Sequence, residues 1–553
     1  MALTLTANEL EGYRGQRADW IYNALDCVMT ARGAKALYPS IEADPFSSRH
    51  YAFQHAEHAP AFVMALRGIA ISESAREEAI KAQEIAEQEA IAVAQEQAAP
   101  WWDIRTHVAT KCGASETGRH KWPREPDLTK KVCALCGQPW LAKAEINPHS
   151  DDQLKALLYA NMGLPEQKEH KEHKVSVSKE CLDKLLTMPS CAHAVSLIEA
   201  VIAARVARKQ LGTLRTRIDP DGRWRASQHV SMDVTGRWSS SGGPFWTGAN
   251  IQNIADRSRG IFVADPGLVL FYADYEKAES NVVAFDAGDQ NYIDAHNAGD
   301  LHTMVARLVW PGIGPWSSGV GPSNCCAEHH TAECCDRGIA DQPTQWNPHL
   351  TYRDFAKHIA HGSAIGMTYY GIARDAHIKQ ADARAAQEAY FSAFRRVRDR
   401  QAEIWRQVQS TGLLTTHVGR RRRFMGRLYG EGADATRREA LAQMQQSMIA
   451  DWVGCAICSL WNLDRHIVPW QAPQSSDSNQ IWLLAQVHDA VLGEVRWGDD
   501  EALRKVLSAM NLSLMVRGRQ LVIPVEIKVG PSWAKKDMKT WHAEGFEWPR
   551  EWR

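Results

Sequence analysis

Two apolar segments of the chain each end in an aspartate, and this arrangement limits what the chain can fold into. Residues 268–275 read LVLFYADY and place Asp274 at the end of an apolar run, whereas residues 482–491 read WLLAQVHDAV and place Asp489 at a bend. Runs of this kind favour buried β-strands. A single aspartate at a strand end is usually a capping or turn residue, but two that meet would form a pair of metal ligands.

Between the two aspartates lies a segment with basic residues at every fourth position. Arg353, Lys357 and His361 follow this spacing, so on a helix they share one face. Cationic donors on one face suit a triphosphate, whose charge must be neutralised while it is held in position. A solvated stripe of charge has the same spacing, and the order of motifs along the chain distinguishes the two interpretations.

The order of these motifs matches a known family. Residues 235–240 read TGRWSS and residues 250–254 read NIQNI, and both precede the first acidic segment, the basic segment and the second acidic segment. Five motifs in this order resemble the family A DNA polymerases, the group of bacterial DNA polymerase I. The resemblance covers roughly residues 150 to 535. It implies an α+β right-hand fold with an antiparallel palm sheet, helical fingers and a helical thumb.

The resemblance also implies a division of the chain into domains. Composition favours helix from about residue 61 to 98, where the family has a long helix that rises from the palm into the thumb. The expected units are 1–60 for an exonuclease-like remnant, 61–225 for the thumb with an insertion at about 101–144, 226–300 for the first part of the palm, 301–430 for the fingers with an insertion at about 316–348, and 431–553 for the second part of the palm.

Phosphoryl transfer explains why the aspartates matter in such a protein. The primer hydroxyl attacks an α-phosphate while negative charge builds on the leaving pyrophosphate, and two Mg²⁺ ions about 3.5 to 4 Å apart can stabilise both oxygens. Magnesium prefers carboxylate oxygens, water and phosphate. We therefore expect Asp274 and Asp489 to bind two Mg²⁺ ions, with the backbone carbonyl of Tyr275 near them.

Further residues are assigned to the incoming dNTP by the resemblance. Glu279 matches the family glutamate that acts as a steric gate against a ribose 2′-hydroxyl, and His302 matches a histidine near the triphosphate. Arg353 and Lys357 match residues that hold the β- and γ-phosphates, and Lys357 is the expected proton donor to the leaving group. The full expected dNTP-binding set is Tyr275, Glu279, His302, Arg353, Lys357, His361 and Ile365.

Contacts with primer-template DNA are implied in the same way. Arg237 matches the family arginine that contacts the minor groove near the growing primer end. The expected DNA-binding set is Arg237, Gln252, Arg438, Gln446 and His488. Residues 420–423 are four consecutive arginines, which form a local basic patch suited to phosphates.

The chain departs from the family pattern at several positions around the nucleotide. His361 replaces the aromatic residue that packs against the sugar, and Ile365 replaces the tyrosine beside the template base, which is also the usual partner of Glu279. Ala442 replaces an asparagine, and Ala490 replaces the acidic residue that follows Asp489. We expect catalysis to survive and base selection or fidelity to differ from the family norm, which a misincorporation assay on Ile365→Tyr would test.

Two cysteine-containing insertions are candidates for zinc binding. In the first, Cys133 and Cys136 form a Cys-x-x-Cys-Gly turn that can place two thiolates on one tetrahedral Zn²⁺. Cys112 is the expected third ligand, and His107 or His120 the fourth. The alternative is a loop with incidental thiols.

The second insertion is denser in cysteine and histidine. It carries adjacent pairs that could supply four zinc ligands, although adjacent side chains point in different directions. The candidate ligands are Cys325, Cys326, His329, His330, Cys334 and Cys335. The spacing matches no standard finger, so the ligand set stays open, and a partner-binding surface is the alternative role.

Composition bears on location and partners. The chain of 553 residues has no run of about 18 uninterrupted apolar residues and no signal-peptide pattern. We therefore expect a cytoplasmic protein that contacts no membrane, in the host cytoplasm if it is phage-encoded. Its twelve cysteines should be thiols or metal ligands rather than disulfides. The net charge of -1 leaves DNA binding to local basic patches.

The N-terminus bears on proofreading. Tyr22 and Asp26 resemble an element of the family's proofreading exonuclease, but about twenty residues precede them. We expect ordinary helix residues here and no proofreading. A phage or mobile-element replicase fits such a chain, with primer-template DNA, dNTPs and either a processivity factor or a separate exonuclease as partners. The alternatives are a repair or translesion polymerase and a catalytically silent DNA-binding descendant; Glu279 disfavours RNA synthesis.

Overall fold

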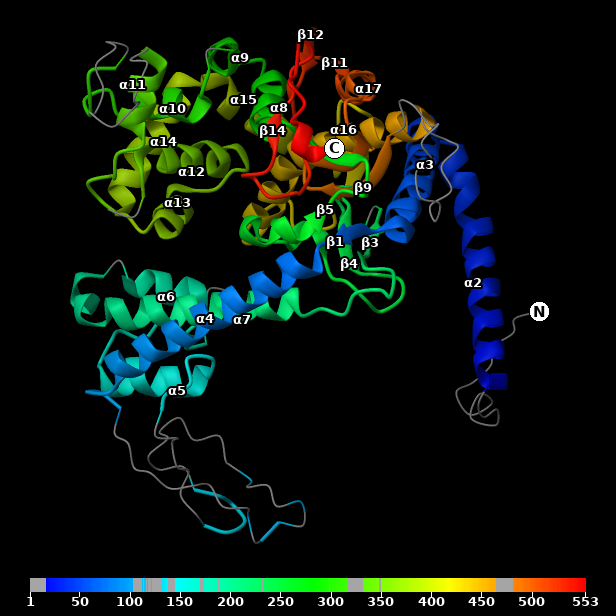
Figure 1. The fold of residues 1–553 in the computed structure, drawn as a ribbon. Coiled ribbons are helices and arrows are strands. Elements are labelled where there is room, and N and C mark those ends of the chain that lie inside the picture. The colour runs from blue at the N-terminus through cyan, green and yellow to red at the C-terminus, as the bar shows by residue number, and fades with distance from the viewer. Residues whose placement is uncertain are drawn as a thin grey trace.

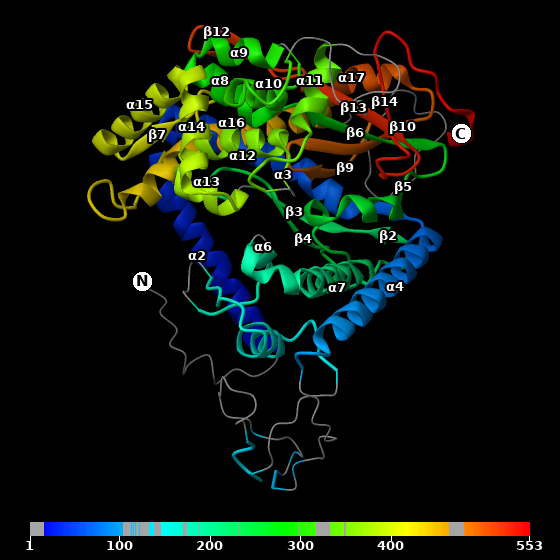
Figure 2. The same ribbon diagram turned by 90° about the vertical axis from the view of Figure 1, so that its left-hand side faces the viewer.

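The computed structural model of the chain describes residues 16–102, 112, 114–115, 117, 121, 132–137, 145–169, 174–186, 188–230, 232–297, 299–316, 332–347, 350–463 and 481–553. Helices predominate, and the sheets are antiparallel (Figure 1). Both views separate a lower group of helices from an upper body that contains the main sheet (Figure 2).

The main sheet has five antiparallel strands in the order β14-β13-β6-β10-β9. These strands are β6 (Leu268–Tyr275), β9 (Trp482–Val487), β10 (Ala490–Arg496), β13 (Val525–Gly530) and β14 (Lys539–Thr540). The central strand β6 is apolar along most of its length because it is covered on both faces. Successive side chains point to opposite faces: Phe271 packs against helix α16 (Ala433–Leu463), whereas Leu270 packs with Trp533 on the other face.

Smaller strands surround the main sheet. A three-stranded sheet is formed by β2 (Arg223–Trp224), β1 (Ile69–Ile71) and β5 (Phe262–Val263). Two-stranded pairs are formed by β3 (Ala226–His229) with β4 (Ser239–Gly242), β7 (Leu413–Thr415) with β8 (Arg421–Arg423), and β11 (Ser513–Val516) with β12 (Arg519–Val522). Helix α17 (Asp500–Met510) packs against α16 and completes the core beneath the sheet.

The lower group of helices corresponds to the expected thumb. Its long helices α4 (Glu73–Ala98) and α7 (Val195–Leu214) pack along each other, and α5 (Asp151–Lys155) and α6 (Lys179–Leu186) complete the group (Figure 1). Among the described residues, the segment Ser190–Leu214 is long and apolar enough to cross a membrane by length and composition, and core helices pass the same test. Its apolar face is buried in this group of helices.

Helix is confirmed over most of residues 61–98, but a short strand interrupts it. Helix α3 (Pro45–Arg67) ends at Gly68, whose φ of +63° breaks the helix. Ile69 and Ile71, which are β-branched, then form β1 before α4 begins at the N-cap Ser72. Helix α3 packs on β9 and α16, so the expected boundary at residue 60 falls inside a helix of the palm.

A second helical group forms the upper left of Figure 1 and corresponds to the expected fingers. Its helices are α8 (Ala278–Ala287), α9 (Gln290–Asn297), α10 (Leu301–Val309), α11 (Ala332–Ala340), α12 (Tyr352–Ala364), α13 (Tyr369–Ala376), α14 (Gln380–Ala393) and α15 (Arg395–Thr411). They share an aromatic core in which Tyr292 stacks on Phe394 at 4.3 Å between ring centroids. Helix α2 (Gln16–Glu42) extends from the opposite side of the molecule and carries Tyr22, which is exposed.

Candidate active site

The main sheet brings Asp274 and Asp489 together. Strands β6 and β10 pair so that Asp274 lies opposite Ala490, and Val487 pairs with Ala490 across the β9–β10 turn. Asp489 is therefore in that two-residue turn, and the backbone N–H of Tyr275 donates to its carbonyl at 3.4 Å. Strand pairing thus places two distant carboxylates at one end of the sheet.

The pair of carboxylates is largely buried, and nearby cations offset its charge only in part: Lys528 acts on Asp274, and Arg237 acts on Asp489. Burial, together with the charge of the Asp489 carboxylate, raises the pKa of Asp274 to about 7. Burial likewise raises the pKa of Asp489. Oδ1 of Asp274 is buried and, among the described residues, has no hydrogen-bond partner. Two buried carboxylates in this state repel each other, and a cation between them would remove the repulsion.

Tyr275 faces away from this pair because side chains alternate along β6. It is buried, and its hydroxyl donates to the carbonyl of Met510 at 2.7 Å. The side chain therefore anchors the strand to α17. The expected contribution of Tyr275 to a metal site, through its backbone carbonyl, stays a prediction.

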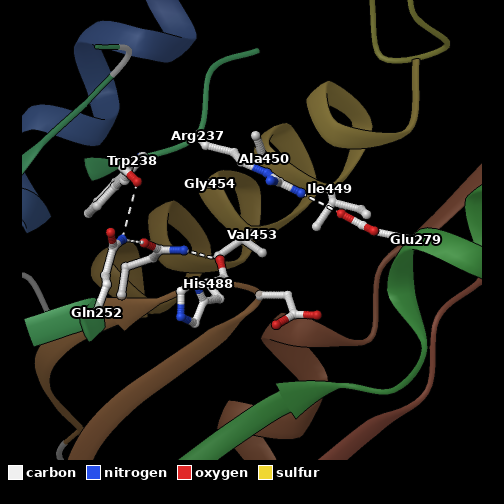
Figure 3. A pocket seen from close by; sticks show the side chains of 11 residues that line it. Arg237, Trp238, Gln252, Glu279, Ile449, Ala450, Val453, Gly454 and His488 are labelled. Atoms are coloured by element: carbon white, nitrogen blue, oxygen red, sulfur yellow. Dashed lines mark hydrogen bonds and ion pairs between the residues drawn. The ribbon is translucent and has the colours of Figure 1, made fainter. Parts of the chain in front are cut away.

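Next to Asp489 is a cavity of about 290 Å³ (Figure 3). Its walls come from the loop before β4, from α8, from the β9–β10 hairpin and from α16. The lining residues are Arg237, Trp238, Gln252, Glu279, Ile449, Ala450, Val453, Gly454, Gln486, His488 and Asp489. Four residues expected to contact nucleotide or DNA, together with one of the two aspartates, therefore border one space.

Glu279 is held by two cationic or hydrogen-bonding side chains at the edge of the cavity. Nη2 of Arg237 donates to its Oε1 at 2.5 Å, as Figure 3 shows, and Nδ1 of His361 lies 3.5 Å from its Oε2. The hydrogen bond with His361 lowers the pKa of Glu279, and the charge of Arg237 acts in the same direction. His361 thus contacts the glutamate whose usual tyrosine partner is replaced by Ile365.

A chain of amide hydrogen bonds supports the β9–β10 hairpin. Nε2 of Gln252 donates to the Trp238 carbonyl at 3.1 Å and to Oε1 of Gln486 at 2.8 Å (Figure 3). The Gln486 amide in turn donates to the carbonyl of His488, whose φ of +59° is left-handed. Gln252 therefore fixes the hairpin, while the His488 side chain is exposed at its tip. Their expected contacts with DNA stay predictions.

The predicted basic helix is α12, and it carries Arg353, Lys357 and His361. Arg353 is not free to face a ligand, since its Nε and Nη2 donate to the carboxylate of Asp300 at 2.6 and 3.2 Å. Burial opposes ionisation of Asp300, but hydrogen bonds from Arg353 and Thr303 leave its pKa below the ordinary range. Lys357 is exposed. The motif spacing gave no signal for the Asp300–Arg353 pair.

His302 lies beside His361, with 5.7 Å between their ring centroids. Burial, together with the charge of His361, lowers the pKa of His302 to about 3. The imidazole is therefore neutral at physiological pH. It can donate one hydrogen bond to an anion, but it adds no positive charge.

Of the four consecutive arginines, Arg420 does not belong to the basic patch expected from the sequence, whereas Arg421 and Arg423 are exposed. Arg420 is buried and donates to both oxygens of Asp451, with the shortest distance at 2.6 Å from Nη2. Arg421 pairs with Asp44 at 2.8 Å. The expectation is wrong for Arg420 because a charge inside the protein needs a partner.

Helix α16 carries two of the expected DNA contacts. Arg438 is exposed, Gln446 is half-buried, and Ala442 lies between them at the position where the family has asparagine. The expected contacts of Arg438 and Gln446 with DNA stay predictions.

Part of each cysteine-containing insertion lies among the described residues. Cys112, Cys133 and Cys136 come together, with all three sulfur atoms within 4.8 Å of one another. His107 and His120 lie outside the described residues. In the second insertion Cys334 and Cys335 lie on α11, whereas four expected ligands lie outside the described residues, namely Cys325, Cys326, His329 and His330.

The chain matches the model of a known protein family over more than half of its length. This model, described as DNA polymerase family A, matches residues 126–311 and 341–535. The chain belongs to this family. The match includes Asp274, Asp489, Arg353 and Lys357.

Relatives and solved structures agree with membership of DNA polymerase family A. DNA polymerase I of Chloroflexus aurantiacus is 28% identical over 446 residues, which cover 76% of this chain and 40% of that protein. The thermostable DNA polymerase I of Thermus thermophilus is 27% identical over 418 residues, 73% of this chain and 42% of the relative. The chain thus spans about two fifths of the length of the curated relatives it matches.

A solved polymerase domain shares the fold. It is the POL domain of Pol1 from M. smegmatis in complex with DNA primer-template and dNTP, with a TM-score of 0.63 and 22% sequence identity. The match covers 87% of this chain and 70% of that domain. The likeness shows that the mixed helix and sheet architecture of this family A chain is that of a polymerase domain.

One buried carboxyl group near the site, that of Glu57, belongs to none of the sequence motifs. Glu57 on α3 accepts a hydrogen bond from Nε1 of Trp238 at 2.9 Å, and its Oε2 has no partner among the described residues. Burial raises the pKa of Glu57 to about 7 from 4.5, and the nearby Asp451 also raises it. In the sequence Glu57 is a charged residue on a helix face that also carries Phe53, Ala61 and Met64.

Glu57→Gln is expected to stabilise the protein at alkaline pH. The folded state keeps this proton up to about pH 7 and the unfolded chain only to about 4.5, so stability present at low pH is lost as pH rises through that window. The loss amounts to about 3 kcal/mol at most, and glutamine, which resembles the protonated acid, avoids it. Urea unfolding at pH 5 and pH 8 measures the effect; an equal difference between variant and wild type at both pH values would contradict this account.

Proposed function

We propose that this family A chain is a DNA-templated DNA polymerase that extends a primer with dNTPs. The observation that carries the proposal is the buried pair of Asp274 and Asp489 beside a cavity bordered by Arg237 and Glu279. A carboxylate pair supplies ligands for metal-assisted nucleotidyl transfer, and the neighbouring cation and gate glutamate suit a primer terminus and a sugar.

The residues of the pair fit divalent metal ions. Oδ1 of Asp274 is buried and has no hydrogen-bond partner among the described residues, and both carboxylates are destabilised by burial when ionised. Hard carboxylate oxygens are the ligands that Mg²⁺ prefers. Asp274 and Asp489 would hold two Mg²⁺ ions, which supply charge stabilisation to the attacking and leaving oxygens.

The fingers provide groups for the triphosphate. Lys357 is exposed on α12 and would donate a proton to the leaving pyrophosphate. Arg353 is paired with Asp300. To bind the β- and γ-phosphates, its guanidinium must therefore either contact Asp300 and the phosphates together or leave Asp300 for the phosphates. His302, being neutral, would act as a hydrogen-bond donor in the same region.

Sugar selection would depend on an altered gate. Glu279 would exclude a ribose 2′-hydroxyl, and His361 would hold it in place of the missing tyrosine, through the 3.5 Å contact. The Arg237–Glu279 contact would link the gate to the primer end. Because His361 and not a tyrosine contacts Glu279, we propose that sugar selection differs from the family norm.

Replacing His361 by phenylalanine is expected to weaken discrimination against ribonucleotides. The change removes the contact with Glu279, whose two partners are both partly exposed, so a loss of about 1 kcal/mol predicts a roughly fivefold lower ratio of kcat/KM for dNTP over rNTP. Glu279→Ala should lower the ratio more, because it removes the gate itself.

Addition of Ile365→Tyr to His361→Phe serves as the matched control. It restores both family residues beside Glu279 and should recover most of the lost discrimination. An unchanged ratio in His361→Phe, with an altered ratio in Glu279→Ala, would show that His361 does not position the gate.

Primer extension tests the proposed function. Wild-type protein is incubated with a labelled primer-template, Mg²⁺ and either four dNTPs or four rNTPs. The proposal requires extension with dNTPs, little with rNTPs and none when the metal is chelated. No extension by folded protein that binds the primer-template would instead support a catalytically silent DNA-binding protein.

Membership of family A and the sequence motifs also support more detailed proposals. We propose two-metal chemistry, a phage or mobile-element origin and lack of proofreading. We also propose a processivity factor or a separate exonuclease as partner, and a cytoplasmic location. Incubation of a mismatched primer end without dNTPs tests proofreading, since excision of the terminal nucleotide would contradict its absence. Processivity and strand displacement distinguish a replicative enzyme from a repair or translesion polymerase.

A further inference from the structure

Three cysteines of the insertion between α4 and α5 meet although one is distant from the others in sequence. Sγ of Cys112 lies 3.9 Å from Sγ of Cys133, and the Cys136 sulfur lies within 4.8 Å of both. A disulfide requires about 2.05 Å between sulfurs. Two thiolates on one tetrahedral Zn²⁺, each at about 2.3 Å, lie roughly 3.8 Å apart. The observed spacing is that of metal ligands.

The backbone around these cysteines forms turns that present sulfur atoms to a common point. The N–H of Gly137 donates to the Cys133 carbonyl at 2.9 Å, and Gly137 has a φ of +68°, which favours glycine. The N–H of Leu135 donates to Sγ of Cys133 at 3.4 Å. An N–H directed at sulfur stabilises a thiolate, the form that binds metal.

A second turn approaches from the other side of the cluster. The N–H of Ser115 donates to the Cys112 carbonyl at 3.2 Å, and the N–H of Ala134 donates to the Lys121 carbonyl at 2.8 Å. The latter bond joins the turn that carries Cys133 and Cys136 to Lys121, earlier in the insertion. Cys112 and Cys133 are each 2% exposed, so this small unit buries its thiols.

One end of the insertion is fixed to the thumb. The side chain of Gln95 on α4 accepts from the backbone N–H of Ile146 at 3.0 Å and donates to the Ile146 carbonyl at 2.6 Å. Ile146 and Trp102 are buried in the thumb core. The cysteine cluster therefore belongs to an excursion that starts and returns at one place on the thumb, away from the carboxylate pair in the palm (Figure 1).

We propose that Cys112, Cys133 and Cys136 bind one structural Zn²⁺ that holds the thumb insertion in shape. Thiolate ligands select zinc over Mg²⁺, and a cysteine-rich site that a fourth protein ligand completes is structural. The site is separate from the proposed Mg²⁺ site in position, ligand chemistry and role. The experiments below identify the fourth ligand.

Metal content of the purified full chain tests the proposal. Zinc is counted by mass spectrometry in wild type, in Cys133→Ser/Cys136→Ser and in the control Cys27→Ser, which changes an exposed cysteine elsewhere. The double variant should lose one Zn²⁺ per chain relative to wild type and to the control. Equal zinc in the double variant and wild type would overturn the proposal. His107→Ala and His120→Ala, measured alongside, identify a fourth protein ligand by the same loss.

Cobalt substitution tests the metal site in the wild-type protein, so it does not depend on whether a cysteine variant folds. Wild-type protein loaded with Co²⁺ should show sulfur-to-cobalt charge-transfer absorption and the intense visible bands of tetrahedral coordination. Absence of both in folded, cobalt-exposed wild type would contradict the site. Asp274→Asn should keep its full zinc content, so loss of polymerase activity and loss of zinc are separate results.

Discussion

Asp274→Asn is expected to reduce primer extension by at least about 1000-fold, because metal ions at such a site supply several kcal/mol of transition-state stabilisation. Asparagine keeps the shape of the side chain but loses the charge that binds the cation. Asp489→Asn should have an effect of similar size. Single-turnover incorporation of one dNTP measures both, with the variant and the primer-template in excess of their Kd.

Folding and DNA binding of these variants provide the control. Each removes one of two buried, mutually repelling carboxylates, so the free energy of unfolding in metal-free buffer should not fall. Primer-template affinity should stay within about threefold of wild type, since phosphate contacts supply most of the binding. Extension by Asp274→Asn at more than a tenth of the wild-type rate would remove Asp274 from the proposed centre.

Lys357→Ala is the second change for which we expect a large effect. Loss of a general acid typically slows a reaction by about 100- to 10,000-fold. Because Lys357 is exposed and, among the described residues, has no hydrogen bond or ion pair that holds it, its removal should leave stability nearly unchanged. The rate of single-nucleotide incorporation at saturating dNTP measures the effect on chemistry.

His358→Ala is a matched control, since His358 is the next residue on α12 and is also exposed. It should retain a rate within about threefold of wild type. Lys357→Arg keeps the positive charge but is a poor proton donor, so it should recover nucleotide affinity more than rate. If Lys357→Ala changed only KM and left the rate intact, Lys357 would bind phosphate without donating a proton.

Local patterns in the sequence were sufficient for the main elements of the palm and fingers. The spacing of Arg353, Lys357 and His361 predicted the helix that became α12 because helical periodicity is a local property. The apolar run before Asp274 predicted β6 in the same way. The family relationship was also correctly inferred, since five short motifs occur in a fixed order.

Local sequence patterns could not predict contacts between segments that are far apart in the sequence. The pairing of Arg353 with Asp300 and the placement of His361 against Glu279 depend on how α10, α8 and α12 pack together. The burial of Arg420 against Asp451 likewise depends on tertiary packing, and it removes one arginine from the basic patch expected from the sequence. These contacts decide which cations face a ligand and which only hold the protein together.

The helix break at Gly68 shows the other limitation. Composition from residue 61 to 98 favours helix, but a left-handed glycine followed by two isoleucines starts a strand that the three-stranded sheet requires. Tertiary pairing outweighed helix propensity there. In the first insertion, the Cys-x-x-Cys-Gly turn was visible in the sequence, whereas the approach of Cys112 to it is a property of the fold.

Template-dependent addition of one nucleotide tests the central claim most directly. Wild-type protein is given Mg²⁺, one dNTP at a time, and four primer-templates that differ only in the base opposite the incoming nucleotide. The account predicts that each template selects its complementary dNTP and that Asp274→Asn adds none. Addition of the same nucleotide on all four templates, or equal addition by wild type and Asp274→Asn, would contradict it.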